Sequence, residues 1–536
     1  MSSILEKTSL LTDAYQISMM YAYWITNDEN NSSTFDVYFR KSPFKGEYAI
    51  FAGIDRVLQT LNGPVFNSDD IDILKKQFDF PAEFYDYIAT LTFDSVTVTS
   101  VKQGEIVFPN EPVMTISGPV LICQSLETRL LNNVSFPTLV ATCARRIVNV
   151  AKNVPCSEFG LRRAQGPDGA MCASQYSIVG GFDTTSNVIA GHVYDIPIVG
   201  TMAHSYIMSC SDTLDTIVSK QCKFDTASFI ECIKQKQQQL SNAGFTSGNQ
   251  TELAAFVKFA IAFPGSFVAL IDTYNTLQSG VINYMIVATT LNEFGYNAVG
   301  LRIDSGDLAY LANECYKKFV IVDDLLGINV LKQCKIMVSN ELSESVVNEL
   351  HTQTQHIKAF GIGTKLATCY DNPALGMVYK LVKINDTPVV KISEESAKTT
   401  IPYGKKLFRL FDQDKQALAD VMFHKDTFDN DIFTKNSELI FRHPTDGTKR
   451  FKISTTKVTA EPLHITLMEN GNVVVNSADV TVQHGKQYCI DRLKSIRPDH
   501  LRITNPTPYK VSVSDDLYNA IAHLIFMETE KYTELS

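Results

Sequence analysis

Residues 151–385 contain a series of short apolar runs that each end in polar or glycine-rich residues, and this pattern constrains the fold most strongly. Helical patterns follow several of the runs, so the segment predicts repeated strand–helix units. Such units form a parallel sheet, and seven or eight of them predict a barrel with its active site in the loops after the strands. The run ends are therefore the first candidates for function. They are EFGLRR (158–163), IVGGFDTTSN (178–187), IPIVGTMAHS (196–205), SFVALIDTYN (266–275), NAVGLRIDSGD (297–307), CKIMVSNELSE (334–344) and IKAFGIGTKL (357–366).

The flanking segments differ from this pattern, and 536 residues are enough for more than one domain. Residues 1–150 mix strand patterns with a helical pattern after Thr12 and Asp13, which we expect to be helix caps. These mixed patterns predict an α+β domain over residues 1–150. Residues 386–536 predict a mostly β region that ends in a helix, and 151–385 predict the catalytic (β/α) domain between them. A glutamine-rich tract at 233–252 suggests a mobile surface insertion.

Composition narrows the class of protein. A net charge of −10, without a basic stripe, argues against binding to nucleic acid. Eleven scattered cysteines without a CxxC pair argue against a zinc ribbon or a disulfide framework. The first residues, MSSILEKTSLLTDAYQ, lack a signal-peptide pattern, and the most apolar long window, FVKFAIAFPGSFVALI, contains lysine, proline and glycine. We therefore expect a cytosolic protein without a membrane span.

Charged and glycine-rich residues at the run ends suggest an anion site. Arg302 can bind a phosphate or carboxylate, and Asp304 and Asp307 are oxygen ligands of the kind that a magnesium–phosphate substrate needs. The turn GIGT at 361–364 could present backbone N–H groups to a phosphate. Each feature also has a structural interpretation: a salt-bridged strand end for RIDSGD, and glycines that a turn requires. His204 alone would be interpreted as a hydrogen-bonded core histidine.

Arg162 and Arg163 lie side by side before the turn-rich stretch AQGPDG, which carries Asp168. The neighbouring residues offer few acids for the arginines, so we expect an anionic ligand there. A second acidic pair, Asp323 and Asp324 in FVIVDDLLG, is similar to a phosphoribosyl pyrophosphate loop but lacks its glycine- and hydroxyl-rich continuation, so we interpret it as structural. The chain has no P-loop, GxGxxG, HxH, HExxH or GxSxG motif.

Six blocks in chain order resemble the nicotinate phosphoribosyltransferase family, from residue 10 to past 410. They are LLTDAYQ, FRKSPFKGEYAIFAG, FGLRRAQGPDGAMCASQYSIVGGFDTTSNV, VGTMAHSYIMS, LRIDSGDL and FGIGTKLAT. The resemblance implies an α/β fold in which an N-terminal domain packs on an irregular (β/α) barrel. It also implies transfer of phosphoribosyl from 5-phosphoribosyl-1-pyrophosphate (PRPP) to nicotinate, the first step of NAD salvage from nicotinate. The products are nicotinate mononucleotide and pyrophosphate.

The family's residue roles carry over to matching positions. His204 stands where the family phosphorylates a histidine with ATP, and that match replaces the core-histidine interpretation. Thr201 and Ser205 match substrate contacts, and Arg162 matches the position nearest the nicotinate carboxylate and the ribosyl phosphate. Whether Arg162 or Arg163 faces the site stays open. Arg302 and Asp304 match residues that bind the phosphoribosyl group. The turn that binds the 5′-phosphate matches Gly361, Gly363 and Thr364.

The resemblance further implies partners and alternatives. Tyr15 matches an aromatic residue that stacks on the pyridine ring from the neighbouring subunit, which implies a homodimer. Mg²⁺ or Mn²⁺ would accompany PRPP and ATP, with Asp304 and Asp307 as possible contacts through phosphate-bound metal. Two alternatives stay open: a nicotinamide or quinolinate phosphoribosyltransferase, because Asp168 and Asp183 could meet an amide, and a catalytically idle binding relative.

Overall fold

Six parallel strands form one sheet, as the strand–helix repeats predict. They are β6 (Cys156–Glu158), β7 (Thr184–Thr185), β8 (Val268–Leu270), β9 (Gly300–Ile303), β10 (Lys335–Ser339) and β11 (Ile357–Ile362). Their order is β7-β6-β11-β10-β9-β8, and every neighbouring pair is parallel. Strands between helices are buried on both faces, which is why they read as continuous apolar runs.

The sheet confirms the α/β class with an irregular, half-open barrel. Among the described residues, β7 and β8 are the two edges of the sheet, so the ring does not close by hydrogen bonds. The run at 196–205 adds a single parallel bridge, between Thr185 and Ile198, instead of a seventh full strand. Six strands and one bridge thus account for the seven run ends.

The computed structural model describes residues 9–246, 248–392 and 399–530. The chain divides into two compact units. The first contains the described parts of 1–143, 175–181 and 371–536, and the second contains those of 144–174 and 182–370. The signal-peptide prediction falls partly on residues 1–8, which lie outside the described residues. Within the described ranges, no helix is long and apolar enough to cross a membrane.

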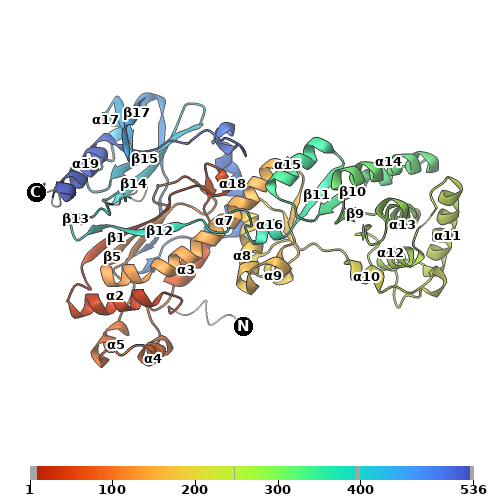
Figure 1. Cartoon of the computed structure of the whole chain (residues 1–536), viewed down its shortest axis with the longest axis horizontal. Helices are drawn as coiled ribbons and strands as arrows, with labels where there is room; N and C mark the ends of the chain where they lie inside the picture. Colours follow the sequence, from red (N-terminus) through yellow and green to blue (C-terminus); the bar gives the residue numbers. More distant parts are fainter. Residues whose placement is uncertain (1–8, 247, 393–398, 531–536) are drawn as a thin grey trace, which may run out of the picture. The chain divides into compact units, whose positions relative to one another are not determined.

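Helices connect the parallel strands of the second unit. The connections carry α9 (Val188–Tyr194), α10 (His204–Met208), α11 (Thr226–Asn242), α12 (Gln250–Ala262), α13 (Val281–Glu293), α14 (Leu308–Leu326), α15 (Glu344–Gln353) and α16 (Thr364–Ala367). Figure 1 shows α11 to α14, in green, beside one another at one end of this unit. Most of α13 is buried, which fits its almost entirely apolar sequence.

The glutamine-rich tract, predicted as a mobile surface insertion, is mostly helical. Most of it forms the second half of α11 and the start of α12. Asp225 caps α11 through a hydrogen bond from Ser228 N, and Ile233 and Leu240 are buried on one face. The glutamines occupy the polar face of an amphipathic helix, so composition indicated exposure but hid the helical period.

The first unit is built from antiparallel and mixed sheets. An antiparallel sheet has the order β13-β12-β1-β5-β3-β19-β20, and a mixed sheet has the order β17-β16-β21-β15-β14-β18. The first consists of β13 (Thr387–Pro388), β12 (Met377–Ile384), β1 (Ser32–Phe39), β5 (Met114–Pro119), β3 (Thr97–Ser100), β19 (Ile465–Glu469) and β20 (Asn472–Val473). The second consists of β17 (Asp446–Ser454), β16 (Glu438–His443), β21 (Val511–Ser514), β15 (Ala417–His424), β14 (Lys405–Phe411) and β18 (Thr459–Pro462). A two-stranded sheet joins β2 (Ala49–Ile50) to β4 (Ile106–Val107).

Helices of the first unit include α2 (Ala14–Ile25), α3 (Ile54–Leu61), α4 (Ser68–Gln77), α5 (Ala82–Ile88), α6 (Val120–Ser125), α18 (Val482–Leu493) and α19 (Asp515–Glu530). The long α7 (Glu127–Ala151) and α8 (Gly166–Val179) each run from one unit into the other. Asp13 precedes α2 as predicted, but its carboxylate accepts a hydrogen bond from Thr128 Oγ1 (2.6 Å) and makes no capping bond.

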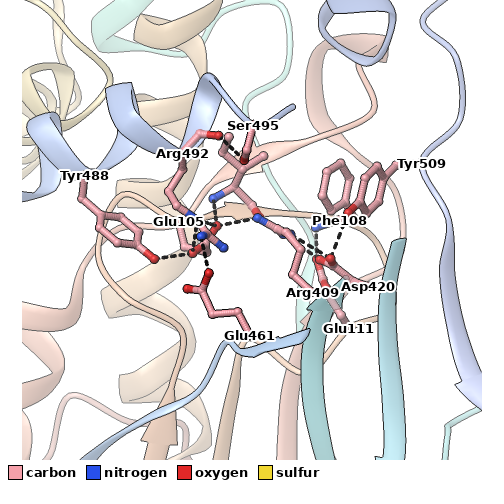
Figure 2. A network of polar contacts seen from close by, with 11 residues as sticks. Glu105, Phe108, Glu111, Arg409, Asp420, Glu461, Tyr488, Arg492, Ser495 and Tyr509 are labelled. Carbon is pink, nitrogen blue, oxygen red and sulfur yellow. Dashed lines mark hydrogen bonds and ion pairs between the residues drawn. The ribbon is translucent and has the colours of Figure 1, made fainter. Parts of the chain in front are cut away.

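A buried network of charged groups joins distant parts of the first unit (Figure 2). Arg409 on β14 is fully buried, binds both oxygens of Asp420 on β15 (2.6 and 2.8 Å) and binds Glu105 (2.6 Å). Tyr488 and Arg492 on α18 also bind Glu105, at 2.6 and 3.1 Å. Removing one member of such a cluster costs about 3–5 kcal/mol, because the opposite charge stays buried and unpaired.

Glu111 lies beside Asp420 in this network and is fully buried. Burial, and then the charge of Asp420, raise the pKa of Glu111 well above its usual range. The backbone N–H of Phe108 donates to one Glu111 oxygen. The protonated Glu111 carboxyl can donate a hydrogen bond to Asp420.

Unfolding should release this proton, which predicts a stability effect. The native state binds the proton, whereas the unfolded chain releases it near the ordinary pKa of 4.5. The free energy of unfolding therefore falls as pH rises above that value, until Glu111 ionises in the native state. Glu111→Gln keeps a donor for Asp420 without a titratable proton, so its thermal midpoint should fall less steeply with pH. Calorimetry of both proteins across pH tests this, and parallel curves would contradict it.

Candidate active site

The loops after the parallel strands bring polar side chains together in the second unit. His204 begins α10, Asp272 follows β8, and Asp304 follows β9. His204 Nε2 lies 3.9 Å from Asp272 Oδ1 and 3.9 Å from Asp304 Oδ2. Its other nitrogen, Nδ1, lies 3.1 Å from Thr273 Oγ1. The imidazole side chain is 40% exposed, so a ligand from solvent can reach it.

Asp272 holds the loop that carries Asp304. Its Oδ2 accepts hydrogen bonds from Asp304 N (3.0 Å) and Ser305 Oγ (2.6 Å). Its Oδ1 is buried beside His204 and has no hydrogen-bond partner among the described residues. Asp304 is oriented in turn by Ser339 Oγ from the end of β10 (2.6 Å). The two carboxylates can therefore stabilise positive charge on the imidazole.

Arg302 points from β9 toward the segment before His204. Its two terminal nitrogens donate to Thr201 Oγ1 (3.1 Å) and to the carbonyl of Met202 (3.2 Å). Burial lowers the pKa of Arg302, and the negative charges of Asp304 and Asp272 oppose this decrease. The positive charge of Arg162 lowers the pKa of Arg302 further. The positive charges of Arg302 and Arg162 therefore influence each other. Two such charges near one another favour the binding of an anion.

Arg162 and Arg163 lie on the 3₁₀ turn η2 (Leu161–Arg163), and both are exposed. Buried Glu158 anchors the residues around this turn. It accepts hydrogen bonds from Gly160 N, Ser174 Oγ (2.7 Å) and Thr185 Oγ1 (2.6 Å). The turn is therefore rigidly placed at the end of β6, and its arginines are available to a ligand.

The glycine-rich turn follows β11 and leads into α16. Phe159 packs against Gly361 so closely that a Cβ at position 361 would overlap the phenyl ring. Thr364 is the first residue of α16 and Gly363 is its N-cap. Because Gly361 lies next to Ser157 of β6 in the sheet, the glycine turn and the arginine turn follow neighbouring strands.

Some of the predicted residues have clear structural roles. Asp307 caps α14 by accepting from Tyr310 N (3.0 Å). Asp168 lies in the first turn of α8, and Asp183 accepts from Cys156 N (3.1 Å). Asp323 is buried within α14 and accepts from Leu331 N and Lys332 N (both 3.0 Å), which supports its structural interpretation. Ser205 is exposed on α10.

Tyr15 lies in the first unit, at the start of α2, with 48% of its surface exposed. Gln16 anchors the helix beside it. The Gln16 side chain donates to the Gln124 carbonyl (3.0 Å), and Gln124 donates back to the Gln16 carbonyl (3.1 Å). Its buried neighbour therefore holds the tyrosine at the surface of the first unit.

The carboxylates near His204 are compatible with a divalent metal that also binds substrate phosphates. Within the described ranges, no three His, Cys, Asp or Glu side chains form a ready metal site. The carboxylates of Asp272 and Asp304 supply two hard oxygen donors, one of which has a buried, unpaired oxygen. Mg²⁺ commonly binds through one or two carboxylates plus substrate phosphates, so the donor set is compatible with it.

Comparison with known proteins decides the family. Models of the N-terminal domain, the family and the C-terminal domain of nicotinate phosphoribosyltransferase match residues 10–135, 271–444 and 404–521. Nicotinate phosphoribosyltransferase of Caenorhabditis elegans is 40% identical, over 98% of this chain and 94% of that protein. The chain belongs to the nicotinate phosphoribosyltransferase family. Nicotinate phosphoribosyltransferase 1 of Arabidopsis thaliana is 42% identical, over 98% of this chain and 95% of that protein.

A solved member of the nicotinate phosphoribosyltransferase family supports the fold. The crystal structure of human nicotinic acid phosphoribosyltransferase matches with a TM-score of 0.82 at 31% identity, covering 96% of this chain and 100% of that one. The membership of the chain in this family confirms the resemblance that the six sequence blocks indicate. Asp272, Thr273 and Ser339 are the polar residues that sequence reasoning missed, although all three lie in run ends that it singled out.

Proposed function

We propose that this protein is a nicotinate phosphoribosyltransferase coupled to ATP hydrolysis. It transfers phosphoribosyl from PRPP to nicotinate: the bond from C1 to pyrophosphate breaks, a bond from C1 to the pyridine nitrogen forms, and pyrophosphate leaves. The observation that carries this proposal is the position of His204 between two strand-end carboxylates, beside Arg302, in a chain of this family. The reaction is the first step of NAD salvage from nicotinate.

The site supplies the electrostatics that the reaction needs. Departure of pyrophosphate builds positive charge on the ribose and negative charge on the leaving group. Asp304 faces the first charge, and the arginines face the second. Arg162 meets the nicotinate carboxylate, because a cation recognises an acid better than an amide, which favours nicotinate over nicotinamide. Gly361, Gly363 and Thr364 hold the 5′-phosphate, and Thr201 and Ser205 contact substrate beside His204.

ATP acts through His204. The γ-phosphoryl group moves from ATP to the imidazole with departure of ADP, and Asp272 and Asp304 stabilise the positive charge that the ring then carries. Mg²⁺ or Mn²⁺, when bound with the substrates, would offset the charge of their phosphates. Asp304 would hold the metal, and Asp307 would assist only through the oxygen that its cap leaves free. Within the described ranges the eleven cysteines form no disulfide, which supports a cytosolic location because the cytosol keeps cysteines reduced.

The protein works as a homodimer in which Tyr15 of one subunit completes the site of the other. Its exposure, with that of Leu11, Met19 and Ile25 around the same helix, supports this assembly. We expect Tyr15→Ala and Arg162→Ala proteins each to be nearly inactive as homodimers. Unfolding and refolding an equal mixture should restore about a quarter of the parent activity, because half of the dimers then hold one intact site. Absence of complementation would contradict a shared site.

The product identifies the reaction. With carboxyl-labelled nicotinate, PRPP and Mg²⁺, the full chain should form labelled nicotinate mononucleotide, which chromatography separates from nicotinate. Loss of label from nicotinate without appearance of the mononucleotide, or no reaction with any amount of enzyme, would contradict the proposal.

A further inference from the structure

Glu158 is a fully buried acid at the end of β6, shortly before the arginine turn η2 (Leu161–Arg163). Neutral donors hold both of its oxygens: Gly160 N donates to Oε1, and Ser174 Oγ (2.7 Å) and Thr185 Oγ1 (2.6 Å) donate to Oε2. Burying a carboxylate is costly, and hydrogen bonds offset that cost only when each oxygen is satisfied. An apolar residue would serve packing better, so packing alone does not account for this acid.

Asn187 fixes the direction of the hydrogen bonds that reach Glu158 Oε2. Its backbone N–H donates to Thr185 Oγ1 (3.0 Å), and its Nδ2 donates to Ser174 Oγ (3.1 Å). A reversed side-chain amide would place its NH₂ group against Ala190 N, from which Oδ1 accepts in this structure. Since amide N–H groups only donate, both hydroxyls must direct their hydrogens at Glu158. The network therefore requires two acceptor oxygens at position 158, which a glutamine cannot supply.

The arginine turn also packs tightly against the glycine turn at 361–364. Phe159 N donates to the carbonyl of Ile362 (2.8 Å). A Cβ at position 160 would overlap Ala367 of α16, the helix that follows the glycine turn. The arginine turn thus has no room to move toward the glycine turn. Loss of the bond from Gly160 N to Glu158 allows movement in the other direction, away from the glycine turn.

We propose that Glu158 is a positioning residue that sets the place of Arg162 relative to the 5′-phosphate turn. This inference rests on the proposed function for the meaning of that arginine and of that turn. Nicotinate mononucleotide carries a carboxylate at one end and a phosphate at the other, so its site needs a fixed spacing between two anion contacts. Glu158 fixes this spacing because it ties the arginine turn to α8 and β7, while the sheet holds the glycine turn.

Hydrogen exchange of the backbone tests this without any substrate. Peptides that cover 159–165 contain the amides of Gly160, Arg163 and Ala164, and the last two donate to the Gly160 carbonyl (2.8 and 3.1 Å). In full-length Glu158→Gln, these peptides should take up deuterium about 5- to 100-fold faster than in the parent, because a buried bond is lost. Unchanged uptake in a folded Glu158→Gln protein would overturn the inference.

Asp323→Asn is the matched control for a general loss of stability. Asp323 is also fully buried and also accepts from neutral donors, the backbone N–H groups of Leu331 and Lys332, but these precede β10 instead of following a strand. The control should lower the thermal midpoint and leave uptake by 159–165 as in the parent. Equal acceleration of uptake in Asp323→Asn and Glu158→Gln would overturn a specific role for Glu158.

Ser174→Ala keeps the test decisive if Glu158→Gln does not fold. It removes one donor to Glu158 from the middle of α8, where alanine favours the helix. Uptake by 159–165 should rise about three- to tenfold, since one of three hydrogen bonds is lost. Should Glu158→Gln not fold, equal uptake by Ser174→Ala and the parent would overturn the inference.

Kinetics link the same residue to Arg162. Glu158→Gln should lower kcat/KM for nicotinate about five- to thirtyfold, with the KM for PRPP within about twofold of the parent. In an Arg162→Ala background the same change should cost less than about twofold, because the displaced side chain is already absent. Equal losses in both backgrounds would overturn the positioning role. Faster exchange in Glu158→Gln, combined with a parent that does not use nicotinate, would contradict the proposed function and support the control of the turn by Glu158.

Discussion

Replacing His204 with asparagine should abolish the stimulation of nicotinate mononucleotide formation by ATP. Asparagine keeps a polar side chain of similar reach but cannot accept a phosphoryl group. We expect the ATP-stimulated rate to fall by about a hundred- to ten-thousandfold, the range for loss of a catalytic group. The measurement is turnover with and without ATP, together with acid-labile phosphate on the protein after incubation with ATP.

His192→Asn is the matched control for this experiment, since His192 is exposed on α9 and belongs to none of the strand-end run ends. It should keep both the stimulation and the label. Thermal unfolding of each protein separates loss of chemistry from loss of fold. If His204→Asn still takes up acid-labile phosphate and responds to ATP, the phosphohistidine assignment is wrong.

Replacing Arg162 with alanine should nearly eliminate the use of nicotinate while the protein stays folded. The side chain is exposed on η2, so its removal leaves no buried charge behind. A charge-assisted contact to a carboxylate is worth about 2–4 kcal/mol, which predicts a fall of roughly 30- to 1000-fold in kcat/KM for nicotinate. Steady-state kinetics at saturating PRPP measures this ratio.

Arg163→Ala, one residue further on the same turn, is the comparison that decides which arginine faces the substrate. The charge of Arg162 contributes to the lowered pKa of Arg302, and our proposal assigns the substrate contact to Arg162. Arg163→Ala should therefore lower kcat/KM much less. Equal losses in both variants would mean that the turn as a whole matters, and a larger loss in Arg163→Ala would reverse the assignment.

The sequence predicted the sheet well because buried parallel strands leave a strong local signal. Six of the seven apolar runs end where a strand ends, and polar residues follow at the carboxyl ends of the strands, as Asp304 does after β9. The helix in the glutamine-rich tract was missed because its apolar residues, such as Ile233 and Leu240, are sparse among polar ones.

Contacts between distant segments could not be predicted from local patterns. The pairing of β1 with β12, and the burial of Arg409 against Glu105, join residues hundreds of positions apart. Asp272 was passed over for a related reason. Only the fold shows that its unpaired oxygen faces His204, whereas a lone aspartate in LIDTYN carries no recognisable motif.

Pyrophosphate release tests the central claim most directly. The full chain is given PRPP and Mg²⁺ with nicotinate, nicotinamide or quinolinate in separate reactions, each with and without ATP. We predict release with nicotinate alone, increased by ATP. Release with nicotinamide or quinolinate instead would keep the PRPP site but contradict the role of Arg162, and no release with any of the three would contradict the assigned reaction.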